Sequence, residues 1–571
     1  MLIHSAEVSR IYRERGWWGD VRLQDLLERN ARAAPEREAL VDPPNLAEIA
    51  HTEPQRLTWR ALASLVERLA EVLLQLGLKR DDVIVVQMAN SHELPAVYLA
   101  CARLGVIASP VVAQYREHEL GHVIEQTQAC ALLVTSRIGA HDHAAMATRL
   151  AARYPQLRSV LLFGSVASTS AAVDMRAAIA RTDSTAELLR HEAAHPVGAD
   201  DVVNIIWTSG SEGRSKGVAR THNDWLLYGP QIGSAYRVGD GTRFLNGRPL
   251  TTHGAFVGSI TPWLVHAGTL VNHQPFTLDV FLSQMRSERI DFTALAPAIL
   301  ASLLAKPALL EGVDFGRLTH IGSGSAPLTE ALVTGFDQLF GVKVINFFGS
   351  TEGASLVSAP DDMPDPALRA LYFPRFGAGG FTWKHRANAL VETRLVDLET
   401  GAAIDVPGKT GELRYRGPMV MTGYYREPEL SIAAFDDQGF YKSGDLFEIA
   451  GDQKQYYRFS GRAKDIIIRG GFNISAEEVE NLIASHPAVA DVAVVSYPDA
   501  RLGERVCACV VVREGHGLSL EALVQYLREV RQVAVIKLPE RLLLVAALPR
   551  SPNNKAIKAA LRELAKSPRQ S

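Results

Sequence analysis

The stretch that decides the fold is residues 202–218, which read VVNIIWTSGSEGRSKGV. Its first eight residues, 202–209, are mainly apolar and predict a buried strand. The loop that follows has glycines at 210, 213 and 217, hydroxyl side chains at 208, 209, 211 and 215, and a lysine at 216. Glycines let backbone N–H groups converge on an anion, and the hydroxyls and Lys216 add donors and charge. This pattern predicts a phosphate-binding loop, with a flexible surface turn as the alternative.

Helical and strand patterns alternate on both sides of this loop, from about residue 21 to 160 and again from 293 to 353. Strands of nearly continuous Val, Ile and Leu between helices predict parallel sheets that helices cover on both faces. After about residue 380 the chain has strands and turns with little helix, which indicates a small barrel or an antiparallel layer. From Lys464 the mixed α/β pattern returns, so a domain boundary is predicted near residues 462–466.

The composition excludes several classes of function. The 571 residues carry 60 Lys and Arg against 63 Asp and Glu, a formal net charge of -3 at pH 7. Because no positive field would attract nucleic acid or an anionic membrane, neither is an expected partner. No apolar run approaches the roughly 18 residues of a membrane span, and the N-terminus lacks the apolar core of a signal peptide. The sequence therefore predicts a cytoplasmic protein, in which Cys507 and Cys509 are small buried residues of one strand rather than metal ligands.

Short polar segments follow other predicted strands, at 322–328, 346–352, 441–445 and 461–465. In one of them, Asp445 follows Ser-Gly and can accept hydrogen bonds from ribose hydroxyls, although such an aspartate is more often a turn residue. In another, Glu352 can hold a magnesium ion together with phosphates. Each segment alone is a weak signal, and their order along the chain makes them informative.

The chain resembles the adenylate-forming superfamily in the order of five motifs, TSGSEGRSKG, NFFGSTEG, YKSGDL, GRAKDIIIRGG and LPRSPNNKAIK. That superfamily contains acyl-CoA synthetases, aryl-acid and amino-acid adenylation enzymes and beetle luciferases. The resemblance extends from about residue 20 to 565. It implies an α/β fold with a large N-terminal domain, residues 1–463, of two helix-flanked sheets plus a distorted β-barrel. A small mobile α+β domain, residues 464–571, would follow.

The resemblance implies a reaction in two halves. A carboxylate attacks the α-phosphate of Mg-ATP to give an acyl-AMP and pyrophosphate, and a thiol then takes the acyl group and releases AMP. The implied cofactors are ATP, Mg²⁺ and CoA, and the implied partner is a small carboxylic acid. Residues 11–42 and Ser215 are most similar to 2,3-dihydroxybenzoate-AMP ligases and cyclohexanecarboxylate-type CoA ligases, whereas Gly254 replaces an asparagine of the aryl-acid ligases.

Three hypotheses follow from this comparison. The first is an acid–CoA ligase acting on an aromatic or alicyclic acid. The second keeps the adenylation but transfers the acyl group to the phosphopantetheine arm of an acyl carrier protein. The third is a degenerate nucleotide-binding homologue, since Glu212 replaces a threonine of the phosphate loop and Asn554 replaces the glycine before Lys555. Retention of the other motif residues favours a working enzyme.

The same resemblance assigns roles to single residues. Lys555 is the catalytic lysine that would bridge the carboxylate and α-phosphate oxygens, Thr351 would touch the α-phosphate, and Glu352 would bind the magnesium ion. Asn346 would meet the adenine amino edge, and Phe348 would stack on the ring. The positions that match nucleotide-binding residues are Thr208, Ser209, Gly210, Ser211, Gly213, Lys216, Gly324, Ser325, Ala326, Asn346, Phe348, Gly349, Ser350, Asp445 and Arg462.

The acyl pocket, the hinge and the thiol tunnel are assigned in the same way. Phe347 replaces a glycine of many relatives, so it should narrow the pocket and favour thin or cyclic acids over long fatty acids. Lys464 matches the hinge about which the small domain would rotate, and Gly470 and Gly471 would then reach the thiol tunnel. The matched acyl positions are His253, Ala255, Ser259, Gly322, Ser325 and Phe347.

Overall fold

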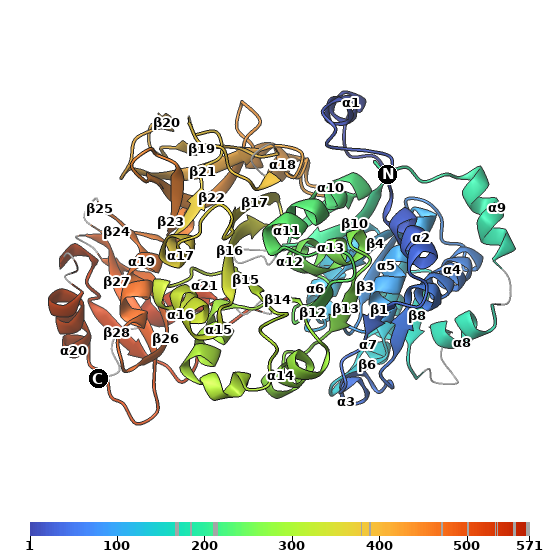
Figure 1. Cartoon of the computed structure of the whole chain (residues 1–571), viewed down its shortest axis with the longest axis horizontal. Coiled ribbons are helices and arrows are strands. Elements are labelled where there is room, and N and C mark those ends of the chain that lie inside the picture. Colours follow the sequence, from blue (N-terminus) through green and yellow to red (C-terminus); the bar gives the residue numbers. More distant parts are fainter. Residues whose placement is uncertain are drawn as a thin grey trace. The chain divides into compact units, whose positions relative to one another are not determined.

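A computed structural model describes residues 1–165, 171–182, 185–208, 215–378, 380–386, 390–469, 472–499, 502–531, 533, 535–551 and 555–566. Contacts divide the chain into two compact units (Figure 1). The first comprises Met1–Thr208, Arg214–Glu392 and Arg416–Gly439, and the second comprises Ser209–Gly213, Thr393–Tyr415 and Phe440–Ser571. The predicted boundary at residues 463/464 falls inside the second unit and stays a prediction.

The first unit contains a seven-stranded sheet that is parallel except for one edge pair, β11 (Gly217–Thr221) and β10 (Val202–Trp207). Along the sheet these two are followed by β4 (Ile107–Pro110), β3 (Val83–Gln87), β5 (Ala131–Thr135), β8 (Ser159–Phe163) and β9 (Val173–Asp174). The predicted strand of the phosphate loop is β10, which pairs with β4 in parallel and with β11 antiparallel. The loop of interest therefore connects β10 and β11.

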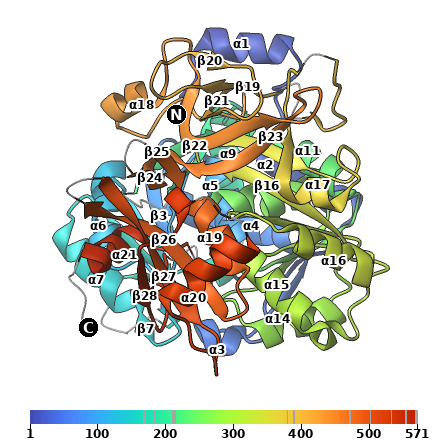
Figure 2. The ribbon, with the colours of Figure 1, turned by 90° about the vertical axis from the view of Figure 1, so that its left-hand side faces the viewer.

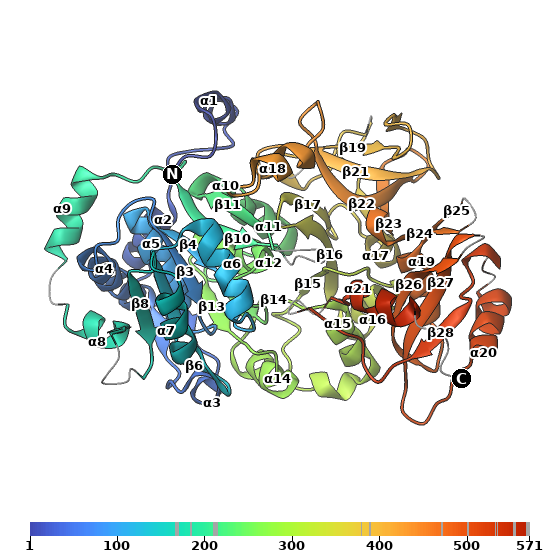
Figure 3. The same cartoon turned by 180° about the vertical axis from the view of Figure 1, so that it is seen from behind.

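Helices cover both faces of this sheet, as its continuously apolar strands require. The helices α6 (Glu117–Thr127) and α7 (His143–Arg153) pack leucine, valine and methionine side chains against one face (Figure 3). Helix α5 (Glu93–Leu104), which is buried along its whole length, lies on β4 and β10 with α4 (Trp59–Gln75) against it. Burial on both sides explains why β3 and β5 contain no exposed residue.

A second sheet of eight strands completes the first unit. Its order is β17 (Gly353–Ser358), β16 (Lys343–Ser350), β15 (His320–Gly324), β14 (Phe292–Ala294), β12 (Arg243–Asn246), β13 (Thr269–Asn272), β1 (Glu38–Val41) and β2 (Arg56–Thr58). All neighbours are parallel except the two edge pairs, β16–β17 and β1–β2. The carboxyl ends of β12, β15 and β16 therefore meet at one edge of the sheet.

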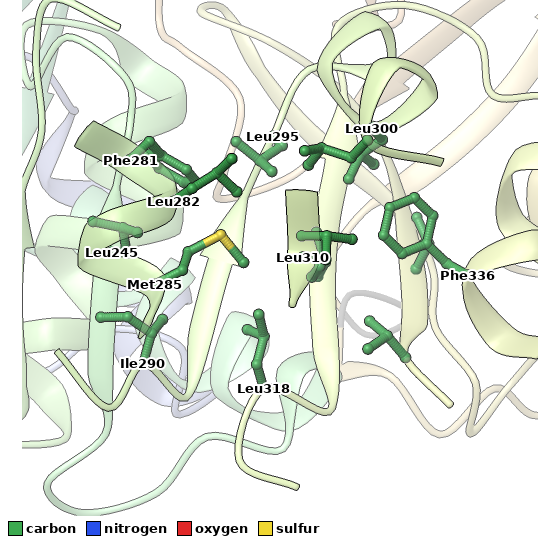
Figure 4. Close-up of a cluster of buried hydrophobic side chains, with 14 of the residues drawn as sticks. Leu245, Phe281, Leu282, Met285, Ile290, Leu295, Leu300, Leu310, Leu318 and Phe336 are labelled. Carbon is green, nitrogen blue, oxygen red and sulfur yellow. The ribbon is translucent and has the colours of Figure 1, made fainter. Parts of the chain in front are cut away.

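One face of this sheet carries a large hydrophobic core (Figure 4). Helices α14 (Leu278–Ser287), α15 (Pro297–Ala305) and α16 (Glu330–Phe340) supply Phe281, Met285, Leu300 and Phe336 to it. At roughly 1.5–3 kcal/mol for each large apolar side chain, this cluster holds the strand ends in place. The two helix-flanked sheets confirm the predicted α/β class.

The second unit begins with an antiparallel sheet, as the pattern after residue 380 predicts. Neighbouring strands along it are β23 (Tyr456–Arg462), β22 (Tyr441–Ala450), β21 (Thr410–Arg416), β19 (Glu392–Val396) and β20 (Ala403–Ile404). The 3-10 turn Ala463–Asp465 then leads into a second sheet of β25 (Phe472–Ser475), β24 (Ile466–Arg469), β27 (Gly503–Val512), β26 (Val489–Asp499) and β28 (Arg541–Leu544).

Helices lie on both faces of the last sheet (Figure 2). Helix α19 (Ala476–Ala484), whose first turn is capped by Ser475, and α20 (Leu520–Gln525) cover the face that carries Val506, Ala508 and Val510. Helix α21 (Lys558–Lys566) covers the opposite face through Leu561 and Ala565. Cys507 and Cys509 are fully buried beneath α21, which confirms their predicted packing role.

No helix among the described residues has the length and apolarity that a membrane span requires.

Candidate active site

Thr208 and Lys216, on either side of the predicted phosphate loop, are held together by two hydrogen bonds. The Thr208 N–H donates to the Lys216 carbonyl at 2.9 Å, and the Lys216 N–H donates to Thr208 Oγ1 at 3.1 Å. Gly217 is required next to them, because a Cβ there would lie 2.8 Å from Ile205 Cγ2 on the paired strand. The predicted loop positions Ser209, Gly210, Ser211 and Gly213, and with them Glu212, lie outside the described residues, so their roles stay predictions.

Tyr424 joins the two charged groups that the sequence predicts for triphosphate and metal binding. Its hydroxyl donates to Glu352 Oε1 at 3.0 Å and lies 3.4 Å from Lys216 Nζ. The Lys216 ammonium also lies 4.5 Å from the centre of the Tyr424 ring, within the range of a cation–π contact. The structure therefore brings Lys216 and Glu352 together, although 135 positions separate them in the chain.

A buried arginine fixes the turn that carries Thr351 and Glu352. Arg220, fully buried on β11, donates to the carbonyls of Thr351 at 2.8 Å and Met419 at 3.0 Å. Gly353 follows at a φ of 130°, where a Cβ would lie 2.4 Å from the Met419 carbonyl oxygen. The Met421 N–H donates to the Glu352 carbonyl at 2.7 Å. The reversal between β16 and β17 thus depends on close backbone contact with the segment around Met419.

The donor set at Glu352 fits a magnesium ion. The Tyr424 hydroxyl donates to Oε1, whereas Oε2 has no hydrogen-bond or ion-pair partner among the residues that the structure describes. Magnesium is usually held by one or two carboxylates together with substrate phosphates and water. Within the described ranges no cluster of three or more His, Cys, Asp or Glu forms a protein-only metal site, so a single carboxylate shared with phosphates is the arrangement that fits.

The predicted adenine positions lie on the neighbouring strands β15 and β16, where Ser323 pairs with Asn346 and Gly324 with Phe347. Asn346 is buried, and its Nδ2 donates to the Ala370 carbonyl at 2.9 Å and to the Arg369 carbonyl at 3.3 Å. Its Oδ1 is the atom left to accept from an amino group. The Phe348 ring lies 6.2 Å from that of Phe373.

Backbone geometry at the ends of β15 and β16 is typical of a binding loop. Ser325 has a φ of 74°, a left-handed conformation that costs energy for a residue with a side chain. Ser325 and Ala326 are exposed beyond the strand, as is Gly349 at the end of β16, and Ser350 Oγ donates to the Gly353 carbonyl at 3.3 Å. These four positions therefore present small groups and backbone at one strand edge.

Phe347 belongs to an aromatic wall, formed with Tyr236 and Phe292, that includes residues outside the predicted acyl set. Its ring lies 5.2 Å from that of Tyr236 at a steep angle, and Tyr236 stacks on Phe292 with centroids 3.8 Å apart. Gly322 makes this packing possible, because a Cβ there would lie 2.8 Å from Phe347 Cε2. Tyr236 and Phe292 were missed by the sequence reasoning, since neither belongs to a motif.

His253 is held as a neutral imidazole between aromatic rings. The rings of Trp225 and Tyr228 lie 5.3 and 5.4 Å from it, and its Nδ1 is buried without a hydrogen-bond partner in the described structure. Burial, together with the Arg220 guanidinium, holds the pKa of His253 well below its usual value. Close by in the chain, Ala255 is buried, and Ser259 Oγ donates to Asn246 Oδ1 at 3.1 Å.

In the second unit, the predicted ribose residue Asp445 forms a cross-strand pair with Arg462, another predicted nucleotide-site residue. Asp445 on β22 is opposite Arg462 on β23, and Arg462 Nε lies 2.9 Å from Asp445 Oδ1. Asp445 is 5% exposed and Arg462 is 40% exposed, so the pair has one buried and one accessible partner. The Asp445 N–H donates to Ser443 Oγ at 3.0 Å. The structure thus confirms that these two residues are adjacent, and their nucleotide role stays a prediction.

Lys555 is exposed just before α21, where its N–H donates to Ser551 Oγ at 3.2 Å and its carbonyl accepts from the Ser551 N–H at 2.8 Å. Lys558, one turn on, is instead held by Glu480 at 2.8 Å. Lys464 belongs to the 3-10 turn Ala463–Asp465, which Arg562 anchors through Asp465 at 2.8 Å. The predicted tunnel residues Gly470 and Gly471, and Asn554 before Lys555, lie outside the described residues.

Comparison with known proteins agrees with this arrangement. The chain is 31% identical over 559 residues to the medium-chain fatty-acid–CoA ligase of Escherichia coli (strain K12), covering 97% of this chain and 92% of the relative. It is 32% identical over 568 residues to the 2-hydroxy-7-methoxy-5-methyl-1-naphthoate–CoA ligase of Streptomyces carzinostaticus, covering 98% and 96%. The solved structure of ATP-bound MatB from Rhodopseudomonas palustris is similar with a TM-score of 0.77 and 27% identity, covering 96% of this chain and 99% of that one.

Family models match both parts of the chain. Residues 478–555 match the AMP-binding enzyme C-terminal domain, and residues 27–425 match the AMP-binding enzyme. Together with the two helix-flanked sheets and the Lys216–Glu352 arrangement, this match confirms the resemblance found in the sequence. The chain belongs to the AMP-binding enzymes, the adenylate-forming superfamily.

Proposed function

We propose that this protein activates an aromatic or alicyclic carboxylic acid as its acyl-adenylate and transfers the acyl group to the thiol of CoA. The family and its two CoA-ligase relatives assign it to the acid–thiol ligases, which use ATP and CoA. The observation that carries the proposal is the Lys216–Tyr424–Glu352 contact, because it pairs a cation for phosphates with a carboxylate that has one oxygen available. A degenerate homologue would have no reason to keep both groups.

The residues of the site support the first half-reaction by positioning and charge rather than by covalent chemistry. Lys216 would neutralise the β- and γ-phosphates, Thr351 would donate to the α-phosphate, and Glu352 would hold Mg²⁺. When bound, the ion neutralises phosphate charge and favours departure of pyrophosphate. Lys555 would stabilise the negative charge that develops between the attacking carboxylate and the α-phosphate. His253, neutral at pH 7, would remain a hydrogen-bonding group and not an acid.

The aromatic wall supports the choice of acid. Phe347, Tyr236 and Phe292 form an aromatic cluster at the predicted acyl position, and aromatic side chains pack favourably against a flat or cyclic acyl group. A long acyl chain would need the space that the Phe347 side chain fills next to Gly322. The acceptor follows from the relatives named as CoA ligases, and a carrier-protein phosphopantetheine arm is the alternative that the same assay tests.

A pyrophosphate-release assay tests this function, with aromatic, alicyclic and fatty acids of four to sixteen carbons, each with and without CoA. The expected result is acid-dependent release that is fastest with a cyclic acid, and a CoA thioester as the product. Lys555→Ala should lower release by about 100-fold or more, as loss of a group that stabilises transition-state charge does. Lys566→Ala, on an exposed lysine of the helix α21 that follows Lys555, is the matched control. Release that no acid stimulates, or an unaffected Lys555→Ala variant, would contradict the proposal.

A further inference from the structure

Arg248 is a half-buried arginine whose guanidinium has no hydrogen bond or ion pair to any residue that the structure describes. Two fully buried arginines of the first unit, by contrast, donate to backbone carbonyls. Arg220 donates to two carbonyls, and the fully buried Arg369 donates to the carbonyls of Val344 and Met363, each at 2.8 Å. A guanidinium that is partly withdrawn from water gains from a hydrogen-bond acceptor, so a ligand that supplies one would stabilise Arg248.

The backbone of Arg248 is held in place by two buried asparagines. The Arg248 carbonyl accepts from Asn246 Nδ2 at 2.7 Å and from Asn90 Nδ2 at 2.8 Å. Asn90 Oδ1 in turn accepts from the Leu250 N–H at 3.0 Å. The loop that leaves β12 is therefore fixed on both sides of Arg248, so these hydrogen bonds define the backbone position from which its side chain extends.

Residues that the sequence assigns to the acyl group surround this position. Asn246 also accepts from Ser259, a predicted acyl residue, at 3.1 Å. A Cβ on Gly254, between His253 and Ala255, would lie 3.0 Å from Arg248 Nη1. Gly254 stands where aryl-acid ligases carry asparagine, so the guanidinium occupies space that this glycine leaves open.

Among the residues that the structure describes, no carboxylate contributes to the electrostatic surroundings of Arg248. Burial lowers the pKa of the Arg248 guanidinium, and the Tyr236 phenol opposes this shift. Burial also raises the pKa of Tyr236 itself. Tyr236 is also the residue that packs on Phe347 and Phe292. The cation therefore lies beside the aromatic wall of the predicted acyl site, and no described Asp or Glu neutralises it.

We infer that Arg248 binds a second carboxylate on the acid substrate, so that the enzyme activates a cyclic dicarboxylic acid at its other carboxyl group. The planar guanidinium can donate two parallel hydrogen bonds to a carboxylate, which supplies both the missing charge and the missing acceptors. The inference rests on the proposed function and deepens it, since it names the class of acid. It also gives a reason for an unpaired cation in an otherwise aromatic site.

Matched pairs of acids test the inference. Benzene and cyclohexane dicarboxylates are compared with their monoamides, which keep the shape and remove one charge. The pyrophosphate-release assay is run with the full chain. For each dicarboxylate that the wild type activates, kcat/KM should be at least 10-fold higher than for the matching monoamide. Arg248→Met should lower this preference at least 10-fold, mainly through KM, and Arg248→Lys should restore part of it.

A control at the other end of the same strand separates binding from stability. Arg243 pairs with Glu38 and Glu288, each at 2.8 Å, so Arg243→Met should lower the unfolding temperature and leave the acid preference unchanged. Arg248→Met should unfold no earlier than the wild type, and a dicarboxylate should raise the unfolding temperature of the wild type alone. A monoamide preferred over its dicarboxylate, or a preference that Arg248→Met leaves intact, would overturn the inference. Failure of every acid to release pyrophosphate would instead contradict the proposed function.

Discussion

Tyr424 shows what a single hydroxyl contributes to this site, because it contacts both the proposed phosphate-binding Lys216 and the proposed metal-binding Glu352. Tyr424→Phe keeps the ring beneath Lys216 and removes the hydrogen bond to Glu352. A hydrogen bond to a charged group is worth about 1.5–3 kcal/mol, so KM for Mg-ATP should rise by about 10-fold or more. Initial rates of pyrophosphate release against Mg-ATP concentration give this value.

The neighbouring tyrosine provides the control for this experiment. Tyr425 is buried in the core of the seven-stranded sheet, and its hydroxyl bonds to neither Lys216 nor Glu352. Tyr425→Phe should therefore leave KM for Mg-ATP close to that of the wild type. An equal effect of the two substitutions would mean that Tyr424 acts through general packing.

Phe347 should set the size of the acid. Phe347→Gly removes the ring that meets Gly322 and Tyr236, and the space it leaves should admit bulkier or longer acids. One methylene group in an apolar pocket is worth roughly 1–3 kcal/mol, about 10–200-fold in kcat/KM, so the shift should be large. Rates over a series of acids of increasing size measure it, with Phe340→Leu, at the end of α16, as the control. An unchanged preference, or a wild type that already prefers acids of twelve or more carbons, would contradict the assignment.

At the scale of elements, helix α19 carries a carboxyl group that makes the stability of the second unit depend on pH. Burial raises the pKa of Glu477 to about 8, and the negative charges of Glu480 and Asp445 add to this shift. The positive charges of Lys558 and Arg462 oppose it. Between pH 4.5 and 8 the unfolded chain ionises this group while the folded chain keeps its proton. Stability should therefore fall as pH rises through this range, by up to about 1.4 kcal/mol per unit.

Glu477→Gln should remove this dependence. The variant should unfold at the same temperature as the wild type near pH 4.5 and at a higher temperature near pH 8, because the amide cannot ionise. Thermal unfolding at half-unit steps of pH measures the difference. Glu478→Gln, on the exposed next residue that pairs with Lys537 at 2.6 Å, is the matched control. Parallel pH profiles for wild type and Glu477→Gln would disprove the pKa shift.

The elements themselves could largely be predicted, whereas the contacts between them could not. The apolar run at 202–207 is found as β10, and the change of pattern after residue 380 is found as the antiparallel sheet, because burial and periodicity are local properties of the sequence. Tyr424, Arg220 and Tyr236 enter the site by tertiary packing from segments without a motif. Arg248, two positions after β12, belongs to none of the motifs either.

At the scale of the whole molecule, the predicted rotation about Lys464 gives a test of the two half-reactions. Lys464→Pro fixes φ near −65° in the 3-10 turn Ala463–Asp465 and should block the change of backbone angles that rotation needs. Acyl-AMP formation should persist and thioester formation should be lost. Single-turnover measurements of both products check this, and Lys464→Ala, which leaves the backbone free, should retain both. Equal loss of both products would place the hinge elsewhere.

The burial of Cys507 and Cys509 beneath α21 has a practical consequence for following this molecule in time. Both sulfhydryls are fully shielded, and Leu561 and Ala565 form part of their cover. A thiol-specific dye can therefore react with them only during moments when α21 has left the sheet. Because Lys555 lies three residues before that helix, the rate of dye incorporation at Cys507 and Cys509 would report detachment of the segment that carries it, without an engineered cysteine.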